Sequence, residues 1–294
     1  MTDHRIRLET GRLALEIEPE IGGSVAAFER RVNGAWEPVF RRTEAGYVDA
    51  LDSAMFPLVP FANRIRGGSF QFENQKIVLP PNMPGEKNPI HGQGWRSAWA
   101  VQSLGPASAD LVYRHTRDVW PWTYDGAITY EIDETRLRVT LTCVNRSEEP
   151  MPCALGLHPY YDCDGSTQLA TRVSRVWTID ADVLPVKAVP AEGRYALDGG
   201  PICGRSLDNG YDGWGGETVM RWPDRELEVR MVCADAGRFQ LFSPPTGGIF
   251  VAEPVQNANC ALNADQADWA DLGITMLGEG DSVSLSATFE VSGA

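Results

Sequence analysis

Two of the four histidines in this chain stand out as side chains that could exchange protons near neutral pH. His91 opens the segment HGQGW after a Pro-rich stretch, and His158 lies in LGLHPYY between Gly- or Pro-containing turns. Both occur where the alternation of apolar and polar residues stops, and loops at the ends of a rigid sheet carry function more often than sheet interiors. They are candidates for function, whereas we expect His4 at the surface and His115 half-buried with its hydrogen bonds satisfied.

A carboxylate in apolar surroundings is a further candidate for proton transfer. Glu253, in IFVAEPVQN, is expected at the end of an apolar strand over 248–252 and is followed by Pro254. Apolar neighbours raise the pKa of a carboxyl group toward values useful for a general base. An exposed acid at the end of a strand is the alternative.

An amide and a guanidinium form a possible ligand-binding pair. Asn63 and Arg64, in PFANRIRGGSF, precede a pair of glycines that indicates a tight turn. A guanidinium held beside such a turn offers a fork of donors for oxygen ligands, although solvated arginines on a surface hairpin are the alternative. The glycine pair is not a phosphate-binding loop, because no Lys-Ser/Thr follows and no helix is expected there. Asp208 and Asp212, in SLDNGYDGW, are typical turn residues on composition alone.

The elements that must position these side chains show the period of two that is typical of strands. Apolar and polar residues alternate over 282–291, and shorter alternations occur at 13–17, 128–132, 137–143 and 227–233. Such alternation indicates antiparallel strands with one buried face, since parallel strands covered on both faces read as continuous apolar runs. The best helical candidate is the short segment 264–272, with Asn263 as a possible N-cap. We therefore predict an all-β fold.

Turns separate these strands throughout, and one domain over 1–294 is the simpler interpretation. The chain contains 29 Gly and 20 Pro, as expected for many short strands joined by turns. No internal repeat or low-complexity linker is found, and strand patterning resumes on both sides of the two longest loops. Those loops, 80–94 and 193–216, are the ones expected to carry function.

The net charge and the cysteine pattern restrict the binding partners and the cellular compartment that we expect for this protein. With 26 Lys and Arg against 40 Asp and Glu, the net charge is −14, which disfavours nucleic acid and anionic membranes as partners. No signal peptide or run of ~18 apolar residues is found, so we expect a cytoplasmic protein. Because no Cys-x-x-Cys pair occurs, the six cysteines are expected to be reduced and mostly packed as small hydrophobes. They are residues 143, 153, 163, 203, 233 and 260.

Several motifs follow one another in a specific order. They are NRI with a following G-x-F at 63–70, HG at 91–92, Trp-Pro-Trp at 120–122, Asn145, GLHPYY at 156–161, LDNGYDGW at 207–214 and AEP at 252–254. This order, over about residues 10 to 291, resembles the aldose 1-epimerase (galactose mutarotase) family. The resemblance implies a large antiparallel β-sandwich, the galactose mutarotase-like supersandwich, with few short helices.

The resemblance also implies roles for individual residues. The histidine of GLHP is the general acid in that family and the glutamate before the late proline is the general base, which match His158 and Glu253. The residues that bind the sugar hydroxyls and ring oxygen match a set of four: Asn63, Arg64, His91 and Asp208.

Details of the cleft are less tightly specified by these motifs. Asp212 remains an alternative to Asp208 as the cleft aspartate. The segment GQGWR after the HG motif departs from the arrangement in many family members, on the substrate side of the cleft. An aromatic ring, from Trp95 or Tyr160, is expected against the C–H face of a sugar.

The expected activity is interconversion of the α and β anomers of a free aldose. Glu253 would take the proton of the C1 hydroxyl while His158, as imidazolium, gives a proton to O5, and reclosure of the ring reverses both transfers. No cofactor or metal is required, and we expect a nearby carboxylate, Asp208, to raise the pKa of His158. The expected partner is a monosaccharide, and the protein is expected to be a monomer or homodimer.

Two other functions remain open on the sequence. A hexose-6-phosphate 1-epimerase would use the same chemistry with a cationic pocket, for which Arg64, Arg66 and Arg96 are available. A non-catalytic sugar-binding protein on the same fold is the third possibility, although the presence of both proposed catalytic residues speaks against it.

Overall fold

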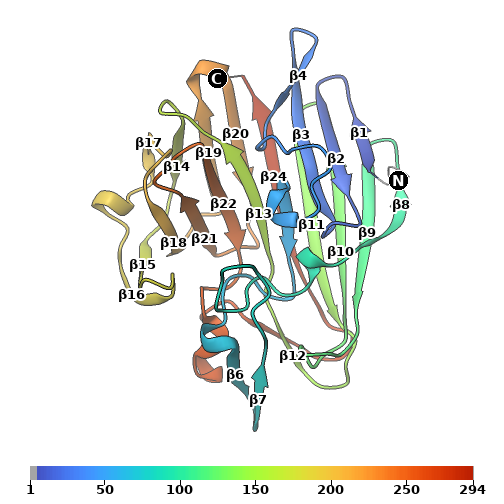
Figure 1. Cartoon of the computed structure of the whole chain (residues 1–294), viewed down its shortest axis with the longest axis vertical. Coiled ribbons are helices and arrows are strands. Elements are labelled where there is room, and N and C mark those ends of the chain that lie inside the picture. Colours follow the sequence, from blue (N-terminus) through green and yellow to red (C-terminus); the bar gives the residue numbers. More distant parts are fainter. Residues whose placement is uncertain (1–4, 294) are drawn as a thin grey trace.

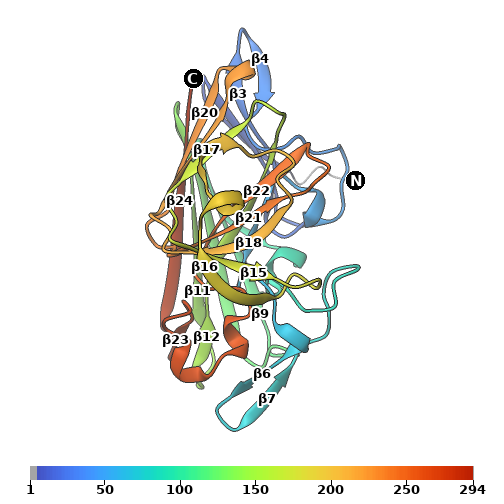
Figure 2. The ribbon, with the colours of Figure 1, turned by 90° about the vertical axis from the view of Figure 1, so that its left-hand side faces the viewer.

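Two large antiparallel sheets pack against each other in the computed structural model, which describes residues 5–293 (Figures 1 and 2). The first sheet has eleven strands. In spatial order they are β1 (Ile6–Glu9), β2 (Leu13–Glu18), β3 (Ser24–Val32), β5 (Met55–Leu58), β13 (Gly156–Asp162), β22 (Ile249–Val255), β21 (Arg238–Ser243), β18 (Leu207–Asp212), β15 (Arg175–Ile179) and β16 (Pro185–Pro190), with β4 (Ala35–Pro38) paired to β3.

The second sheet has nine strands and forms the other layer in Figure 2. They are β17 (Asp198–Pro201), β14 (Gln168–Thr171), β19 (Glu217–Trp222), β20 (Leu227–Val232), β24 (Ser282–Ser292), β11 (Arg136–Asn145), β10 (Tyr124–Ile132), β9 (Ser108–His115) and β8 (Ala100–Leu104). Two small antiparallel pairs complete the strands of the described residues: the hairpin of β6 (Ser69–Phe72) with β7 (Gln75–Val78), and the pair of β12 (Met151–Cys153) with β23 (Thr275–Leu277), which are far apart in the sequence.

The helices of the described part of the chain are single 3₁₀ turns. They are η1 (Ala50–Asp52), η2 (Arg66–Gly68), η3 (Gly94–Arg96), η4 (Gly193–Tyr195), η5 (Pro223–Arg225), η6 (Ala261–Asn263) and η7 (Gln266–Asp268). None of these helices is long and apolar enough to cross a membrane. The all-β fold with few short helices is thus confirmed.

The alternation of apolar residues builds the core between the two layers. All five segments with this pattern are strands, and in β24 the residues Leu285, Ala287 and Phe289 are fully buried while their neighbours are half-buried or exposed. The ring of Phe289 meets that of Phe40 edge-on at 5.1 Å. Burial of one face of each sheet is the main force that holds the layers together.

The best helical candidate of the sequence, 264–272, forms no α-helix. The structure has only the short turns η6 and η7 in this region, because Asn263 does not cap a helix here. Its side chain instead accepts from the backbone N–H of Arg66 and donates to the carbonyls of Arg66 and Ser69. Trp269 is buried against Phe70, so the segment closes over the β6–β7 hairpin.

One predicted loop and the predicted positions of His158 and Glu253 also differ from the structure. Residues 193–216 are not one loop, since they contain η4, β17 and β18. His158 lies within β13 rather than between turns, and Glu253 lies within β22, which continues to Val255. Both candidate residues are therefore held by the middle of a sheet. His4 lies outside the described residues.

The cysteines follow the prediction only in part. Cys143, Cys153, Cys233 and Cys260 are free and buried, as expected of small apolar side chains. The remaining two, 163 and 203, form a disulfide with their Cα atoms 5.6 Å apart, so the prediction of reduced thiols is wrong for this pair. Their separation of 40 residues carries no spacing signal, since only the fold brings the two segments together.

Candidate active site

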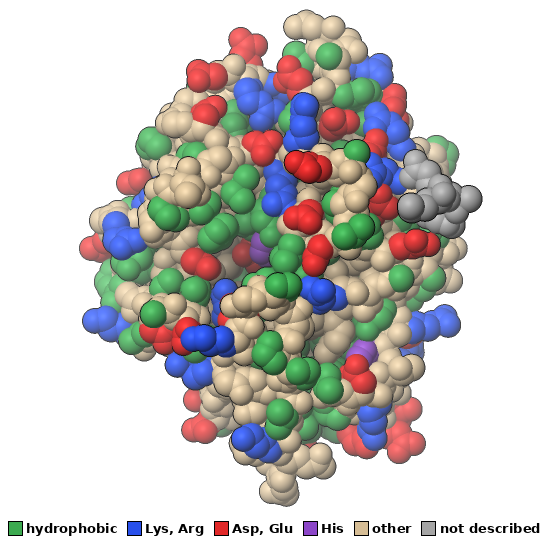
Figure 3. Space-filling model, viewed as in Figure 1, with side chains coloured by type: hydrophobic (Ala, Val, Ile, Leu, Met, Phe, Trp, Pro, Cys, Tyr) green, Lys and Arg blue, Asp and Glu red, His purple; other side chains and the backbone are tan. Residues whose placement is uncertain are grey.

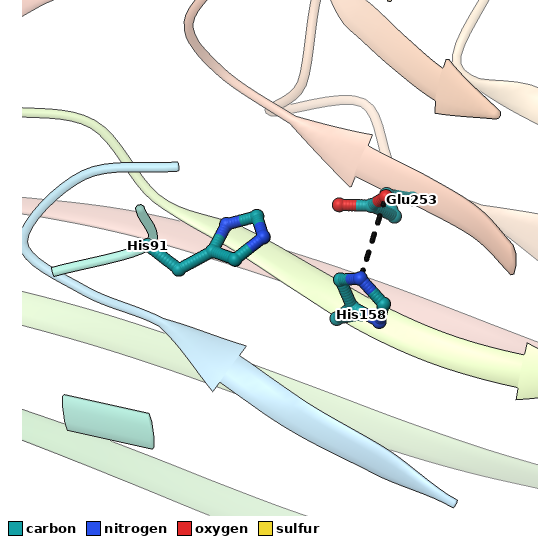
Figure 4. Close-up of side chains that lie close together, drawn as sticks. All are labelled: His91, His158 and Glu253. Carbon is teal, nitrogen blue, oxygen red and sulfur yellow. Dashed lines mark ion pairs between the residues drawn. The ribbon is translucent and has the colours of Figure 1, made fainter. Parts of the chain in front are cut away.

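Adjacent strands place His158 and Glu253 opposite each other. Strands β13 and β22 pair at Gly156↔Val255 and at Tyr160↔Val251, and this common register puts position 158 across from position 253. Side chains at opposed positions project from the same face of a sheet. The Nε2 atom of His158 lies 3.7 Å from Oε1 of Glu253, as the dashed line in Figure 4 marks. Residues 95 positions apart in the chain thus form one pair.

His158 is largely buried, Glu253 is buried, and both side chains are incompletely hydrogen-bonded. Their side chains are 11% and 4% exposed. Nδ1 of His158 and Oε2 of Glu253 are buried without a hydrogen-bond partner in the described structure. Because an unpaired buried polar atom costs free energy, such atoms at one place point to a ligand that completes them. Figure 3 shows a hollow near the middle of this face with histidine and acidic side chains at its floor.

Aromatic rings fix the imidazole of His158 from the neighbouring strand. Phe56, its partner in β5, stacks on it with ring centroids 4.4 Å apart and an interplanar angle of 13°. Trp95 stacks on the far side of Phe56, with ring centroids 5.3 Å apart, and is fully buried. Its ring therefore cannot contact the C–H face of a sugar, contrary to one of the two expectations. The ring of Tyr160 lies 4.7 Å from that of His158 but has the guanidinium of Arg41 over it at 3.6 Å.

His91 joins the pair from the loop over 80–94, and its ring points toward the other two side chains (Figure 4). Its Nδ1 atom accepts the backbone N–H of Asn63 at 3.1 Å. This bond places the proton of the neutral ring on Nε2, so His91 offers a hydrogen-bond donor to the site.

The glycine of the HG motif makes this loop conformation possible. Gly92 has φ +68°, and a Cβ atom there would lie 2.3 Å from the carbonyl oxygen of Val59. Only glycine allows this close approach without a shift of the backbone.

Asn63 and Arg64 lie beside His91 and are held there by hydrogen bonds to two residues, Asn257 and Glu86, that the sequence did not reveal. Asn63 donates from Nδ2 to the carbonyl of Asn257, and the Asn257 side chain bonds both backbone groups of Ala62. Arg64 donates from Nε to Glu86 at 2.7 Å. Asn257 and Glu86 were not predicted, since an isolated Asn or Glu in an irregular segment carries no signal of its own.

The two candidate aspartates lie at opposite ends of β18. Asp208 accepts from Nε2 of Gln240 at 2.9 Å, and Gln240 is the register partner of Glu253. Asp212 is bonded instead to Arg238 and to the indole of Trp177. The geometry therefore brings Asp208, and not Asp212, to the pair. Gln240 was missed, although a polar residue in the apolar run RFQLF is a signal that could have found it.

Burial sets the protonation of the site. It lowers the pKa of His158 to about 3, assisted by the charges of Arg41 and Arg64. Burial, together with the charge of Asp208, raises the pKa of Glu253 well above 4.5 despite the opposing effect of Arg64. The predicted rise in the pKa of Glu253 is confirmed in direction. The prediction that Asp208 raises the pKa of His158 is wrong, because desolvation of the ring dominates.

The donor set does not suit a metal ion. One ligand atom from each of His91, His158 and Glu253 lies within 4.8 Å of the other two. A metal requires a nitrogen lone pair, whereas the N–H of Asn63 directs the lone pair of His91 away from the pair and leaves a proton on Nε2. The cluster is better suited to hydrogen bonds and proton transfer.

Comparisons with known proteins identify the family and the fold. A family model described as aldose 1-epimerase matches residues 4–270. The uncharacterized protein YphB of Escherichia coli K12 is 28% identical over 259 residues, which is 87% of this chain and 84% of YphB. YihR of the same organism is 29% identical over 110 residues, 36% of this chain and 35% of YihR.

Solved structures share the fold over the full length. A candidate aldose 1-epimerase from Escherichia coli K12 superposes with a TM-score of 0.90 at 24% identity, covering 99% of both chains. A galactose mutarotase-like protein from Clostridium acetobutylicum has a TM-score of 0.85 at 17% identity, covering 99% of this chain and 95% of its own. These likenesses confirm the galactose mutarotase-like fold. With the family match over most of its length, the chain belongs to the aldose 1-epimerase family.

Proposed function

We propose that this protein interconverts the α and β anomers of a free, uncharged aldose by opening and reclosing the sugar ring. The observation that carries the proposal is the buried pair of His158 and Glu253, 3.7 Å apart, each with one polar atom left without a partner. Ring opening needs one proton removed from the C1 hydroxyl and one delivered to O5. A pair of positioned acid and base groups suffices for this, with ~10²–10⁴-fold from each group.

The directions of the two pKa shifts suit this chemistry. Because the pKa of His158 is lowered to about 3 and that of Glu253 is raised well above 4.5, the pair holds one proton, on the carboxyl group, at pH values between these two pKa values. Transfer of that proton to the imidazole gives an ion pair of the same net charge, in which Glu253 is the base and His158 the acid. We propose that the hydroxyls of a bound sugar favour this form, because they hydrogen-bond the charged groups that burial disfavours.

Four further side chains are suited to hold the sugar. Arg64 and the Nε2–H of His91 provide donors, while Asp208 provides acceptors and Gln240 both. The Oε1 atom of Gln240 is buried without a hydrogen-bond partner in the described structure, as expected for an acceptor that a ligand hydroxyl satisfies. A small number of placed polar and charged donors and acceptors fixes the orientation of a ligand that is rich in hydroxyls.

The arrangement of the arginines favours a free sugar over a sugar phosphate. Arg64 is paired with Glu86, and Arg96 lies 3.6 Å from Asp49 and over the ring of Trp95. Arg66 donates to the carbonyl of Pro185. A phosphate site needs cationic charge that no carboxylate balances, whereas Arg64 and Arg96 each lie beside a carboxylate and Arg66 donates to a backbone carbonyl.

Anomer exchange tests the proposal directly. NMR saturation transfer, or polarimetry, on glucose, galactose, arabinose, xylose and glucose 6-phosphate should show acceleration for at least one free aldose. His158→Gln and Glu253→Gln should each lower kcat by ~10²-fold or more, while Glu149→Gln, an exposed carboxylate paired with Arg117, should not. Sugar binding without acceleration for any sugar would favour the non-catalytic alternative and refute the proposal.

A further inference from the structure

We propose that Glu86 is a positioning and specificity residue: it orients the guanidinium of Arg64 and balances its charge, so that Arg64 binds hydroxyls and the site rejects anionic sugars. This inference rests on the proposed function, because it concerns how the same site chooses its substrate. Glu86 belongs to none of the motifs that carry the family resemblance, and it reaches the site from the loop over 80–94.

The contact between the two side chains is short and sheltered. Nε of Arg64 lies 2.7 Å from Oε2 of Glu86, and the side chains are 10% and 11% exposed. By contrast, the pair of Arg117 and Glu149 is 57% and 59% exposed. Solvent and salt weaken exposed pairs much more than buried ones, so the first pair is a fixed part of the site.

The carboxylate is held by its own loop as well as by the arginine. Its Oε1 atom accepts the backbone N–H groups of Lys87 and Asn88 and the side-chain amide of Asn88. The Oδ1 atom of Asn88 in turn accepts the N–H of Gly67, three residues beyond Arg64. Glu86 is thus fixed relative to the chain segment whose arginine it contacts.

The backbone of Arg64 is equally constrained. Its N–H donates to Oδ1 of Asn259 at 3.0 Å, and its carbonyl accepts the N–H of Cys260 at 3.1 Å. With the backbone and Nε both fixed, the planar guanidinium has one orientation. The hydrogen bond to Glu86 uses Nε, so the N–H groups on Nη1 and Nη2 are the ones that can serve a ligand.

Charge balance gives this pairing its effect on specificity. The positive charge of Arg64 acts on His91, His158, Asp208 and Glu253, which places it within range of the whole site. Burial opposes ionisation of Glu86, but the hydrogen bond and charge of Arg64 outweigh it and lower the pKa of Glu86. The pair is therefore ionised and neutral overall, and an incoming anion meets the carboxylate together with the cation.

The test compares Glu86→Gln and Glu86→Ala with the wild type. Gln keeps an acceptor for Nε but removes the negative charge, so we expect KM for the best free aldose to rise ~3-fold with kcat within about 2-fold. Binding of glucose 6-phosphate, measured by calorimetry, should tighten at least ~5-fold in this variant. Ala also frees the guanidinium to move and should raise KM by ~10-fold or more.

A matched control separates the charge of Glu86 from the order of its loop. Lys87, the next residue, pairs with Asp182 on the surface, and Asp182→Asn removes that tether without touching Arg64. We expect KM and phosphate-sugar binding of Asp182→Asn to match the wild type. Equal changes in Asp182→Asn and Glu86→Gln would assign the effect to loop order and overturn the inference. Melting temperatures confirm that each variant folds.

The outcomes also separate this inference from the proposed function. A wild type that accelerates anomer exchange, with unchanged KM and phosphate-sugar binding in both Glu86 variants, overturns the role of Glu86 alone. A wild type that binds an aldose without accelerating its exchange refutes the epimerase function, while weaker aldose binding and tighter phosphate-sugar binding in Glu86→Gln still support the role of Glu86. A wild type that neither binds nor converts any aldose overturns both.

Discussion

Glu253→Gln should stabilise the folded protein increasingly as the pH rises, although it removes the proposed base. Burial raises the pKa of Glu253 above 4.5, the value expected in the unfolded chain. Between 4.5 and the raised pKa, the folded protein holds a proton that the unfolded chain has released. Stability contributed by this group is thus lost as the pH rises through that window, and below 4.5 both states hold the proton.

The magnitude follows from the proton linkage. Each pH unit in that window costs ~1.4 kcal/mol of the free energy of unfolding. For a chain of 294 residues the entropy of unfolding is roughly 0.6 kcal/mol/K, so one pH unit corresponds to ~2 °C in Tm. Glutamine does not titrate and matches glutamate in size. The difference in Tm between Glu253→Gln and the wild type should therefore grow by ~2 °C per pH unit between pH 5 and the raised pKa of Glu253.

Differential scanning calorimetry of both proteins from pH 5 to pH 8 measures this difference. Comparing the two at each pH removes the contributions of groups that titrate equally in both proteins, which are the groups that do not interact with Glu253. Glu149→Gln, at an exposed site, is the control and should show no such growth. A Tm difference that stays flat over the whole range would refute the claim that Glu253 is held in its neutral form by burial.

Three other measurements test separate parts of the structure. The kcat/KM for anomer exchange should stay level as the pH falls from 7 to 5, because burial lowers the pKa of His158 to about 3; a decline centred near pH 6.5 would contradict this. Gly92→Ala should destabilise the fold by about 2 kcal/mol or more, measured by urea unfolding, since its Cβ would lie 2.3 Å from the oxygen of Val59; Gly67→Ala, with φ +65° but open space around it, should cost only about 1 kcal/mol. Alkylation of the denatured, unreduced protein should label four cysteines, and reduction should raise the number to six; six labels without reductant would exclude the disulfide.

Sequence patterns predicted correctly those strands whose alternation reflects the burial of one face. The alternation over 282–291 predicted β24 correctly, because one face of that strand is buried and the other is not. The same reasoning failed at 264–272, where Asn263 bonds a neighbouring hairpin instead of starting a helix. Tertiary contacts outweigh the modest propensity of a two-turn segment.

The site shows the same division between local and long-range information. The motifs made His158 and Glu253 candidates, but the distance between them depends on the register of β13 with β22, which only the assembled sheet defines. The protonation of His158 could not be predicted, because the ring loses its water through packing against Phe56 from a third strand. Glu86 is likewise significant only through the residue it meets.

Burial of the pair links the stability of the protein to its proposed chemistry. Below pH 6.5 the unfolded chain binds a proton at His158 that the folded protein does not hold until about pH 3, so this group favours folding as the pH rises. Glu253 has the opposite effect above 4.5. Between about pH 4.5 and 6.5 the two groups change the free energy of unfolding with pH in opposite directions. In the folded protein the carboxyl group of Glu253 keeps its proton while the imidazole of His158 has none. The folded protein therefore keeps a single proton on the pair between the lowered pKa of His158 and the raised pKa of Glu253, and the proposed ring opening, which returns both groups to their starting forms, requires one transferable proton.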